Sequence, residues 1–318
     1  MAESAEMIVA SGLTKKFGPL TAVDNVDMSV GAGEVLGFLG PNGAGKTTTM
    51  RMVTGYLPIT SGTATVCGYD VTTQPTEIKQ KIGYLPEGAP LYGDMTAIAL
   101  MDFVAGVRGL SGSDKRNKID AAIEKLELGP VANRPIDTLS KGYKRRVGLA
   151  QAILHDPEVL ILDEPTDGLD PNQKHQVRNL IRDMAADKAI IISTHILEEV
   201  EAVCTRAAII AAGRIVFDGS PADLQAKSRR HNAVTIQVRP DLISVVQSEC
   251  EAIPAVERVE NGAAASSLLV IPRNGEPIIQ LVSEIVRTKG LEVDEVFVER
   301  GNLDEVFHQL TLGVSGQS

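Results

Sequence analysis

The sequence predicts an α/β domain followed by a smaller α+β domain. At 318 residues the chain is longer than a single hydrophobic core usually supports. Apolar runs rich in β-branched residues alternate with helical patterns over residues 1–220, which is typical of helices packed on a sheet. Runs that lack polar alternation predict central strands covered on both faces. The clearest strand candidates are Val35–Leu39, Val159–Leu162, Ala189–Ser193 and Ala207–Ala211.

The strand signal disappears between residues 96 and 155, where helical spacing takes over. The apolar residues Ile119, Ala122, Ile123 and Leu126 repeat at that spacing. We therefore expect this region to form a helical insertion in the α/β domain.

A polar and charged stretch without apolar periodicity, AKSRRHNA, begins at residue 226 and marks a boundary. We expect residues 7–225 to form the first domain, 226–232 a linker and 233–312 an accessory domain. The patterns in the last segment predict the βαββαβ order of a ferredoxin-like domain. The expected elements are strands 234–238, 256–260, 268–271 and 293–298, helices 242–252 and 277–288, and a last helix at 303–310.

Composition and charge argue against several classes of protein. The net charge is −10 and 3% of residues are aromatic, whereas a nucleic-acid groove needs basic surface and stacking rings. The three cysteines are far apart and not in metal-ligand spacing, which favours a reducing cytosol over a disulfide framework or a zinc site. The acidic first ten residues do not resemble a signal peptide, and the apolar runs are too short to span a bilayer. We therefore expect a soluble chain without a nucleic-acid partner.

The stretch GPNGAGKTTT, residues 40–49, carries the strongest chemical signal. It fits G-x-x-x-x-G-K-[ST] through Gly40, Gly45, Lys46 and Thr47, and it lies between a predicted strand and a helix, as that pattern requires. Residues without Cβ atoms let backbone N–H groups point inward, and the helix adds its positive end. We expect Lys46 on the β- and γ-phosphates of a nucleotide and the Thr47 hydroxyl on Mg²⁺. The alternative is a glycine-rich tight turn with a solvated lysine.

The segment VLILDEP, residues 159–165, supplies the carboxylates that such a site needs. Asp163 ends an apolar strand at the edge where α/β sheets hold ligands, so we expect it to reach the metal bound at Thr47. Glu164 is expected to accept a proton from the attacking water or to orient it, a role worth roughly 10²- to 10⁴-fold in rate. The alternative is that these acids cap a helix, although Pro165 follows at once.

Together these motifs resemble the nucleotide-binding subunit of an ATP-binding cassette (ABC) transporter, over roughly residues 7–225. After GPNGAGKTT come LSKGYKRRVGLAQAIL at 139–154, similar to the signature segment of the family, then VLILDEP, DGLD at 167–170, and STH ending at His195. The resemblance implies a P-loop NTPase cassette with a mixed sheet core, a helical subdomain at about 96–155 and a Mg²⁺-dependent ATPase activity. It implies that ATP is bound through Gly40, Asn42, Gly43, Gly45, Lys46, Thr47 and Thr48.

In this family two cassettes sandwich ATP, and each signature segment covers the phosphate loop of the other. The resemblance places Ser140 and Gly142 at the γ-phosphate, although Ser140 also fits a helix N-cap. Lys141 and Tyr143 depart from the commonest LSGGQ form. We therefore expect pairing with a second cassette, identical or different.

By the same resemblance, His195, Asp170 and Phe17 complete the nucleotide site. His195 is expected to sense the γ-phosphate and position the attacking water; the alternative is a structural histidine. Asp170 is expected along the dimer seam, and Asp170-Pro171 followed by Gln173 also fits a helix N-cap with a capping box. Phe17 is expected to stack on adenine, or else to be a residue at the edge of the core.

Glu87, in the segment IGYLPEG at 82–88, stands where the family usually has glutamine. The resemblance makes this position a link between Mg²⁺, the attacking water and the membrane partner. A carboxylate can bind magnesium but donates no hydrogen bond unless it is protonated. We expect Glu87 to be a catalytic and metal-binding residue; the alternative is a plain loop acid.

A dense basic cluster lies in the signature segment, at Lys141, Lys144, Arg145 and Arg146. We expect these residues to form a solvated helix face. The alternatives are that they orient the helix or contact a partner.

The ending GNLDEVFHQLT, residues 301–311, resembles the tail of an extra domain on cassettes that pair with export-type membrane proteins of the ABC-2 class. The LSKGY form resembles cassettes of gliding-motility or related export systems. We therefore expect an ATP-hydrolysing subunit on the cytoplasmic face of the inner membrane, bound to an integral membrane permease through region 96–155 and the Glu87 loop. The alternatives are a soluble ABC-family ATPase outside transport and a regulatory module that does not hydrolyse ATP.

Overall fold

The structure is a computed structural model that describes residues 6–88, 91–264 and 266–315. The acidic amino-terminal segment is therefore only partly described, because residues 1–5 lie outside these ranges. The chain divides into two compact units, one containing residues 6–219 and 310–315 and the other residues 220–309. Within the described ranges, none of the helices combines the length and the apolar character that crossing a bilayer requires.

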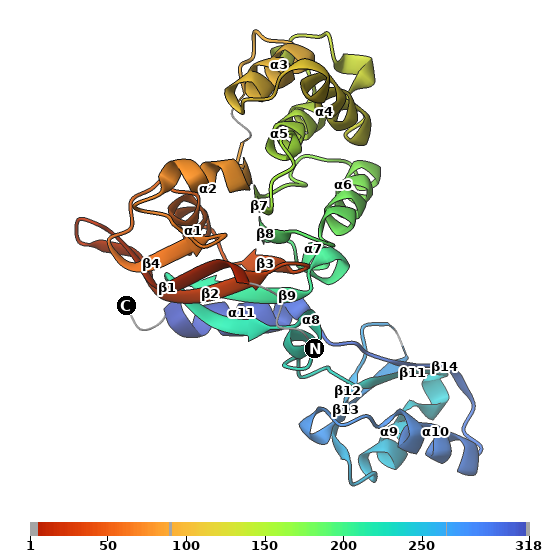
Figure 1. Ribbon diagram of the computed structural model, residues 1–318. Helices are drawn as coiled ribbons and strands as arrows, with labels where there is room; N and C mark the ends of the chain where they lie inside the picture. Colours follow the sequence, from red (N-terminus) through yellow and green to blue (C-terminus); the bar gives the residue numbers. More distant parts are fainter. Residues whose placement is uncertain (1–5, 89–90, 265, 316–318) are drawn as a thin grey trace. The chain divides into compact units, whose positions relative to one another are not determined.

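The first unit contains a six-stranded sheet, part of which is labelled in Figure 1. Its strands are β3 (Val35–Leu39), β6 (Ile82–Leu85), β7 (Val159–Asp163), β8 (Ala189–Thr194), β9 (Arg206–Ala211) and β10 (Arg214–Gly219). They lie in the order β10-β9-β3-β8-β7-β6, and all pairs are parallel except β9 with β10. Every residue of β3, β7 and β8 is buried, which confirms the prediction of central strands covered on both faces.

A four-stranded antiparallel sheet in the order β2-β1-β4-β5 completes this unit. Its strands are β1 (Glu6–Phe17), β2 (Leu20–Gly31), β4 (Ser61–Val66) and β5 (Tyr69–Asp70). Val26 of β2, Met50 of α1 (Lys46–Val53) and Ile161 of β7 belong to one buried cluster. Leu160 and Leu162 of β7 belong to a second cluster on the opposite face, as the two-residue period of a strand requires.

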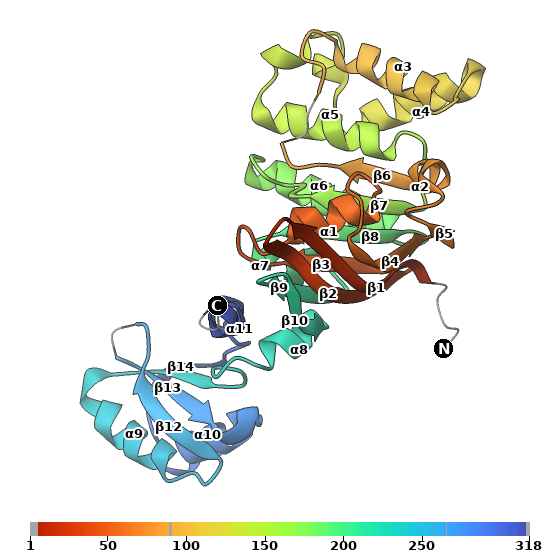
Figure 2. The same cartoon turned by 90° about the vertical axis from the view of Figure 1, so that its left-hand side faces the viewer.

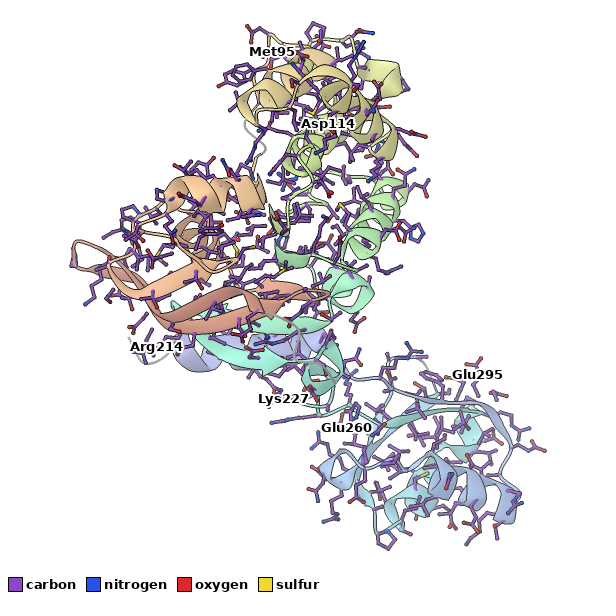
Figure 3. All side chains as sticks on the ribbon, in the orientation of Figure 1. Met95, Asp114, Arg214, Lys227, Glu260 and Glu295 are labelled. Atoms are coloured by element: carbon purple, nitrogen blue, oxygen red, sulfur yellow. The ribbon has the colours of Figure 1, made fainter. Side chains whose placement is uncertain are left out.

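Helices supply many of the other residues of the second cluster. They are α3 (Ala97–Val107), α4 (Gly112–Lys125), α5 (Lys141–Ile153), α6 (Pro171–Met184) and α7 (Leu197–Val203), while α2 (Pro75–Lys81) precedes β6. Figure 2 shows α3, α4 and α5 grouped in one layer. In the described residues between 96 and 155 the chain forms no strand, as the sequence predicts, and a single bridge joins Thr96 to Pro135. Met95 and Asp114, labelled in Figure 3, lie before α3 and in the first turn of α4.

The second unit has the predicted βαββαβ order. Its elements are α8 (Pro221–Gln225), β11 (Val234–Val238), α9 (Ile243–Glu251), β12 (Val256–Asn261), β13 (Ser267–Pro272), α10 (Ile279–Thr288), β14 (Val293–Val298) and the first part of α11 (Leu303–Ser315). The sheet order is β12-β13-β11-β14, and all three pairs are antiparallel. Val246 of α9 and Val282 of α10 share a buried cluster with Ile236 of β11. Glu260 and Glu295, labelled in Figure 3, lie on the two edge strands.

Candidate functional site

The phosphate-loop candidate, residues 40–47, runs from β3 into α1. An added Cβ at Gly40 would lie 2.4 Å from the carbonyl oxygen of Ile210, and one at Gly45 would lie 2.8 Å from that of Ala22. Gly45 also has a φ of 112°, which L residues rarely adopt. The shape of the loop therefore depends on two positions that admit no side chain.

Lys46 begins α1 and extends back along this loop. Its Nζ donates to the carbonyl oxygens of Gly40 at 2.6 Å and Pro41 at 3.1 Å. Burial lowers the pKa of Lys46, and nearby carboxylates, Glu164 first among them, oppose that shift. No side chain caps the N-terminus of α1, so its first backbone N–H groups are available to an anion.

Thr47 and Asp163 come from distant parts of the chain and form a hydrogen bond. Thr47 Oγ1 donates to Asp163 Oδ2 at 3.0 Å, and the hydroxyl of Ser193 donates to Oδ1. Asp163 is the buried last residue of β7, and Ser193 lies opposite it on β8. Because Mg²⁺ prefers oxygen ligands, the Thr47 hydroxyl and the Asp163 carboxylate fit this ion. Ser193 is not among the site residues predicted from the sequence, and its place beside Asp163 follows from the register of β7 and β8.

Glu164 and His195 contact each other, with 2.8 Å between Oε1 and Nδ1. Glu164 has a φ of 54°, a left-handed conformation that is uncommon for a residue with a Cβ and is concentrated at functional sites. Its side chain is 14% exposed, whereas that of His195 is 58% exposed. Burial raises the pKa of Glu164, and the hydrogen bond with His195 partly opposes this. A raised pKa makes the carboxylate a stronger base for accepting a proton from water.

A cavity of about 280 Å³ opens beside these groups. It is lined by Ala22, Asn42, Gly43, Gly45, Lys46, Thr47, Thr48, Glu87, Asp163 and Glu164. Glu87 therefore shares this cavity with Thr47 and Asp163, the two candidate magnesium ligands. Among the described residues, the predicted nucleotide contacts outside this lining are Phe17, Gly40, Ser140, Gly142 and Asp170.

Ser140 is the N-cap residue of α5. Its Oγ accepts a hydrogen bond from the backbone N–H of Tyr143 at 3.3 Å, which confirms the N-cap interpretation. An added Cβ at Gly142 would lie 2.7 Å from Oε1 of Gln173 on α6. The cap sets where α5 begins, and Gly142 leaves space for the side chain of Gln173.

Asp170 caps α6 in the way that the sequence predicts. Its carboxylate accepts a hydrogen bond from the backbone N–H of Gln173 at 2.9 Å, and the Gln173 side chain accepts one from the backbone N–H of Asp170 at 3.4 Å. Pro171 occupies the first turn. The capping box is therefore confirmed, and it holds the loop that precedes α6.

Phe17 ends β1 with 47% of its surface exposed. The Nζ atom of Lys15 lies 5.1 Å from the centroid of its ring. An aromatic ring this exposed is not a core residue, so it is accessible for stacking.

The prediction that the basic cluster forms a solvated helix face is wrong for two of its four residues. Lys141 and Lys144 reach solvent, but Arg145 and Arg146 are each only 5% exposed. The physical reason is helical phase, because Arg145 lies three residues after the buried Gly142 on the face of α5 that packs inward.

The two buried arginines have different partners. Arg145 Nη1 donates to the carbonyl oxygen of Pro86 at 3.1 Å, and Nη2 donates to the carbonyl oxygens of Asp163 and Glu164. Arg146 Nη1 donates instead to the carbonyl oxygen of Leu126 at 3.2 Å, inside the helical region. Arg145 therefore contacts the candidate site, a role that the sequence does not predict.

Glu199, in the first turn of α7, is a third residue of the site that the sequence does not predict. The Thr194 hydroxyl donates to Glu199 Oε2 at 2.9 Å, and the Thr166 hydroxyl donates to Oε1. Thr194 directly precedes His195, and Thr166 follows Glu164 by two residues. The buried Glu199 thus connects the segments that carry both members of the Glu164–His195 contact. The sequence does not distinguish the buried Glu199 from its exposed neighbour Glu198.

This fold and site define an ATPase with a phosphate loop and a cassette-type helical region. Residues 23–167 match the family model described as ABC transporter. The chain is 31% identical over 314 residues to the Nod factor export ATP-binding protein I of Ralstonia nicotianae, with 97% of this chain and 94% of that protein covered. It is 33% identical over 312 residues to the daunorubicin/doxorubicin resistance ATP-binding protein DrrA of Streptomyces peucetius, with 96% and 92% covered.

A solved structure named "Structure of ATP binding subunit of ABC transporter" is also similar. Its TM-score is 0.65 at 27% identity, and the match covers 69% of this chain and 92% of that chain. The chain belongs to the ATP-binding subunits of ABC transporters. It is accordingly an ATP-binding subunit with ATPase activity.

Proposed function

We propose that this chain binds MgATP in the cavity beside Lys46 and hydrolyses it in a sandwich of two cassettes, driving export through a permease of the ABC-2 class. The observation that carries the proposal is the division of the site. The cavity contains the phosphate loop together with Asp163 and Glu164, whereas Ser140 and Asp170 are not part of its lining in the described residues. A second cassette would supply these missing contacts, and a copy of this chain has them.

The residues of the cavity fit MgATP. Lys46 and the first N–H groups of α1 offer positive charge to the β- and γ-phosphates. Thr47 and Asp163 offer oxygen ligands to Mg²⁺, which neutralises phosphate charge when it is bound. Glu164 accepts a proton from the attacking water at a carboxylate oxygen, and His195 orients that carboxylate through the bond to Oε1.

A groove of about 650 Å³ beside Glu87 supports the proposal of a membrane partner. It is lined by Arg51, Tyr56, Leu57, Tyr84, Leu85, Pro86, Leu91, Tyr92, Gly148 and Gln151. Pro86 lines this groove while the next residue, Glu87, lines the ATP cavity, so one short segment borders both. The many aromatic and aliphatic side chains fit an amphipathic helix of a permease. Glu87 then links that helix to the Mg²⁺ ligands.

The names of the relatives support export over the alternatives. Two proteins that match more than nine-tenths of this chain are named for Nod factor export and for daunorubicin/doxorubicin resistance. A cassette paired with such a permease works at the cytoplasmic face of the inner membrane. A soluble ABC-family ATPase outside transport remains the second candidate. A regulatory module that does not hydrolyse ATP is disfavoured, because Glu164 and His195 are paired at the cavity.

Steady-state hydrolysis by the purified full-length chain tests the ATPase assignment. Glu164→Gln keeps the shape of the side chain but removes the base, so we expect turnover to fall roughly 10²- to 10⁴-fold while ATP still binds. Glu124→Gln, an exposed change on α4, is the matched control and should leave turnover unaltered. Full activity in Glu164→Gln would contradict the proposed role.

Crosslinking tests the sandwich. The three cysteines, Cys67, Cys204 and Cys250, are first replaced. Ser140→Cys and Asn42→Cys are then combined in the Glu164→Gln background, which should hold ATP without turnover. We expect a disulfide between two chains only when ATP is present. No crosslink between chains with ATP bound would contradict a sandwich of identical cassettes.

Recovery from membranes tests the transport role. The tagged chain is purified from detergent-solubilised membranes, and we expect an integral membrane protein to accompany it. Tyr56→Asp, a change in the groove, should release that protein without changing the basal rate of ATP hydrolysis. If the wild-type chain brings down no membrane protein, the soluble alternative is favoured.

A further inference from the structure

We propose that Arg145 is a positioning residue that couples the signature end of α5 to Glu164, so that hydrolysis in one cassette responds to ATP held with its partner. This inference rests on the proposed two-cassette function. It adds a physical connection between the two ATP sites of the sandwich. The hydrogen bonds of Arg145 go to backbone carbonyl groups, so it acts through other residues and not on the nucleotide.

A single guanidinium group joins two segments of the ATP cavity. Nη1 of Arg145 holds the carbonyl group of Pro86, directly before Glu87, and Nη2 holds the carbonyl groups of Asp163 and Glu164. The planar fork of arginine suits such a bridge, because its donors have fixed directions. The segment that borders the permease groove and the segment that carries the catalytic carboxylate are therefore held by the same side chain.

The choice of partners is unusual for a buried cation. Taking Arg145 out of water is unfavourable, and burial lowers its pKa, although the charges of Asp167, Asp163 and Glu164 oppose this. Because Arg145 binds carbonyl oxygens, it does not itself occupy the carboxylate oxygens of Asp163 and Glu164. Its positive charge still lies close to both carboxylates. An apolar residue could fill the same space but could supply neither these hydrogen bonds nor this charge.

The bond to Glu164 acts on a strained backbone. Glu164 keeps a φ of 54°, a conformation that persists only where its surroundings enforce it. Arg145 contributes to this enforcement by holding the carbonyl group of the same residue. A displacement of Arg145 would therefore change the direction of the Glu164 side chain and its contact with His195.

Helix α5 connects this bond to the partner cassette. Ser140 caps the helix, and Arg145 follows five residues later, about 7.5 Å along the axis. A helix of this length moves as one body, so a shift of Ser140 toward the ATP of the partner moves Arg145 as well. Each cassette would then place Glu164 productively only when the opposite site is filled. The expected consequence is positive cooperativity of ATP hydrolysis.

The test compares neighbouring arginines of equal burial. Arg145→Gln and Arg145→Lys are set against Arg146→Gln and Arg146→Lys, since Arg146 is equally buried but bonds to Leu126 away from the cavity. For each full-length variant, kcat, KM and the Hill coefficient are measured over a range of ATP concentrations. Equilibrium binding of a fluorescent ATP analogue and thermal unfolding are measured in parallel.

We expect Arg145→Gln to lower kcat roughly 10- to 100-fold. Losses of this size are typical when a group that holds metal-binding residues in place is removed. Nucleotide affinity should stay the same and the Hill coefficient should fall toward 1. Arg145→Lys keeps the charge but not the fork, so it should fold and still lose cooperativity. Both Arg146 variants should keep the wild-type Hill coefficient even if they are less stable.

If Arg145→Gln does not fold, Arg145→Lys alone decides the question. Wild-type cooperativity in a folded Arg145→Lys chain would overturn the inference. Equal loss of cooperativity in the Arg146 variants would also overturn it, because the effect would then be general to the helix. A wild-type chain that binds ATP but does not hydrolyse it would instead overturn the proposed function itself.

Discussion

Glu164 Oε1 lies 2.8 Å from His195 Nδ1, and this contact joins the ends of the neighbouring strands β7 and β8. The two side chains differ in environment, because Glu164 is mostly buried and His195 is mostly exposed. Burial is the largest influence on the Glu164 pKa and raises it, whereas His195 acts in the opposite direction. The pair therefore combines a base of raised proton affinity with a partner that solvent and ligands can reach.

Glu164→Gln should stabilise the fold at neutral pH. The folded-state pKa of Glu164 is raised, so folding favours its protonated form. That favourable contribution is fully present below the unfolded pKa, near 4.5, and is lost as the pH rises through the folded pKa. Glutamine is uncharged at every pH and has no such loss, so we expect a higher melting temperature for Glu164→Gln at neutral pH. Well below pH 4.5 the difference should disappear. Thermal unfolding at the two pH values measures it.

The exposed change Glu124→Gln is the control for this measurement. Because its side chain is in solvent, we expect the free energy of unfolding to change by no more than about 0.5 kcal/mol at either pH. A Glu164→Gln chain that melts below the wild type at neutral pH would show that the carboxylate stabilises the fold.

Thr47→Val should raise the Mg²⁺ concentration needed for hydrolysis. Valine keeps the volume of threonine but removes the hydroxyl that lies 3.0 Å from Asp163 Oδ2, so both a candidate ligand and the orientation of the carboxylate are lost. We expect half-maximal activity to require roughly 10- to 100-fold more Mg²⁺. Titration of the ATPase with Mg²⁺ measures this. Thr47→Ser, which restores the hydroxyl, should return to the wild-type requirement, and an unchanged requirement in Thr47→Val would exclude Thr47 as a ligand.

Most of the fold could be predicted because its signals are local. The run Val159–Leu162 has no polar alternation, and a strand buried on both faces is what such a run requires. The capping box at Asp170 is written in four consecutive residues, so its geometry follows from the sequence alone. The phosphate loop is similarly defined by its glycines. The backbone packed around Gly40 and Gly45 leaves no room for a side chain at either position.

Arg145 and Glu199 could not be placed in the site from composition, because their burial depends on contacts between distant segments. Arg145 is one of four cations at the start of α5, and its carbonyl partners come from the ends of two other elements, such as Pro86. Glu199 is one of two adjacent acids, and its hydroxyl partners come from Thr166 and Thr194. Because charged residues are mostly exposed, the sequence predicts that both side chains lie in solvent. Only the packed structure provides the donors and acceptors whose hydrogen bonds offset the free-energy cost of burying these charges.

Glu199→Ala should weaken both the fold and the catalytic contact. The hydroxyls of Thr166 and Thr194 are buried and donate to this carboxylate, so removing it leaves them without that acceptor. We expect a loss of about 1–3 kcal/mol in the free energy of unfolding and a lower kcat, because Thr194 directly precedes His195. Denaturant unfolding and steady-state ATPase measure the two effects. Glu198→Ala, its exposed neighbour in the same turn of α7, should change neither. Equal stability of the two alanine variants would mean that the carboxylate of Glu199 does not hold these two segments together.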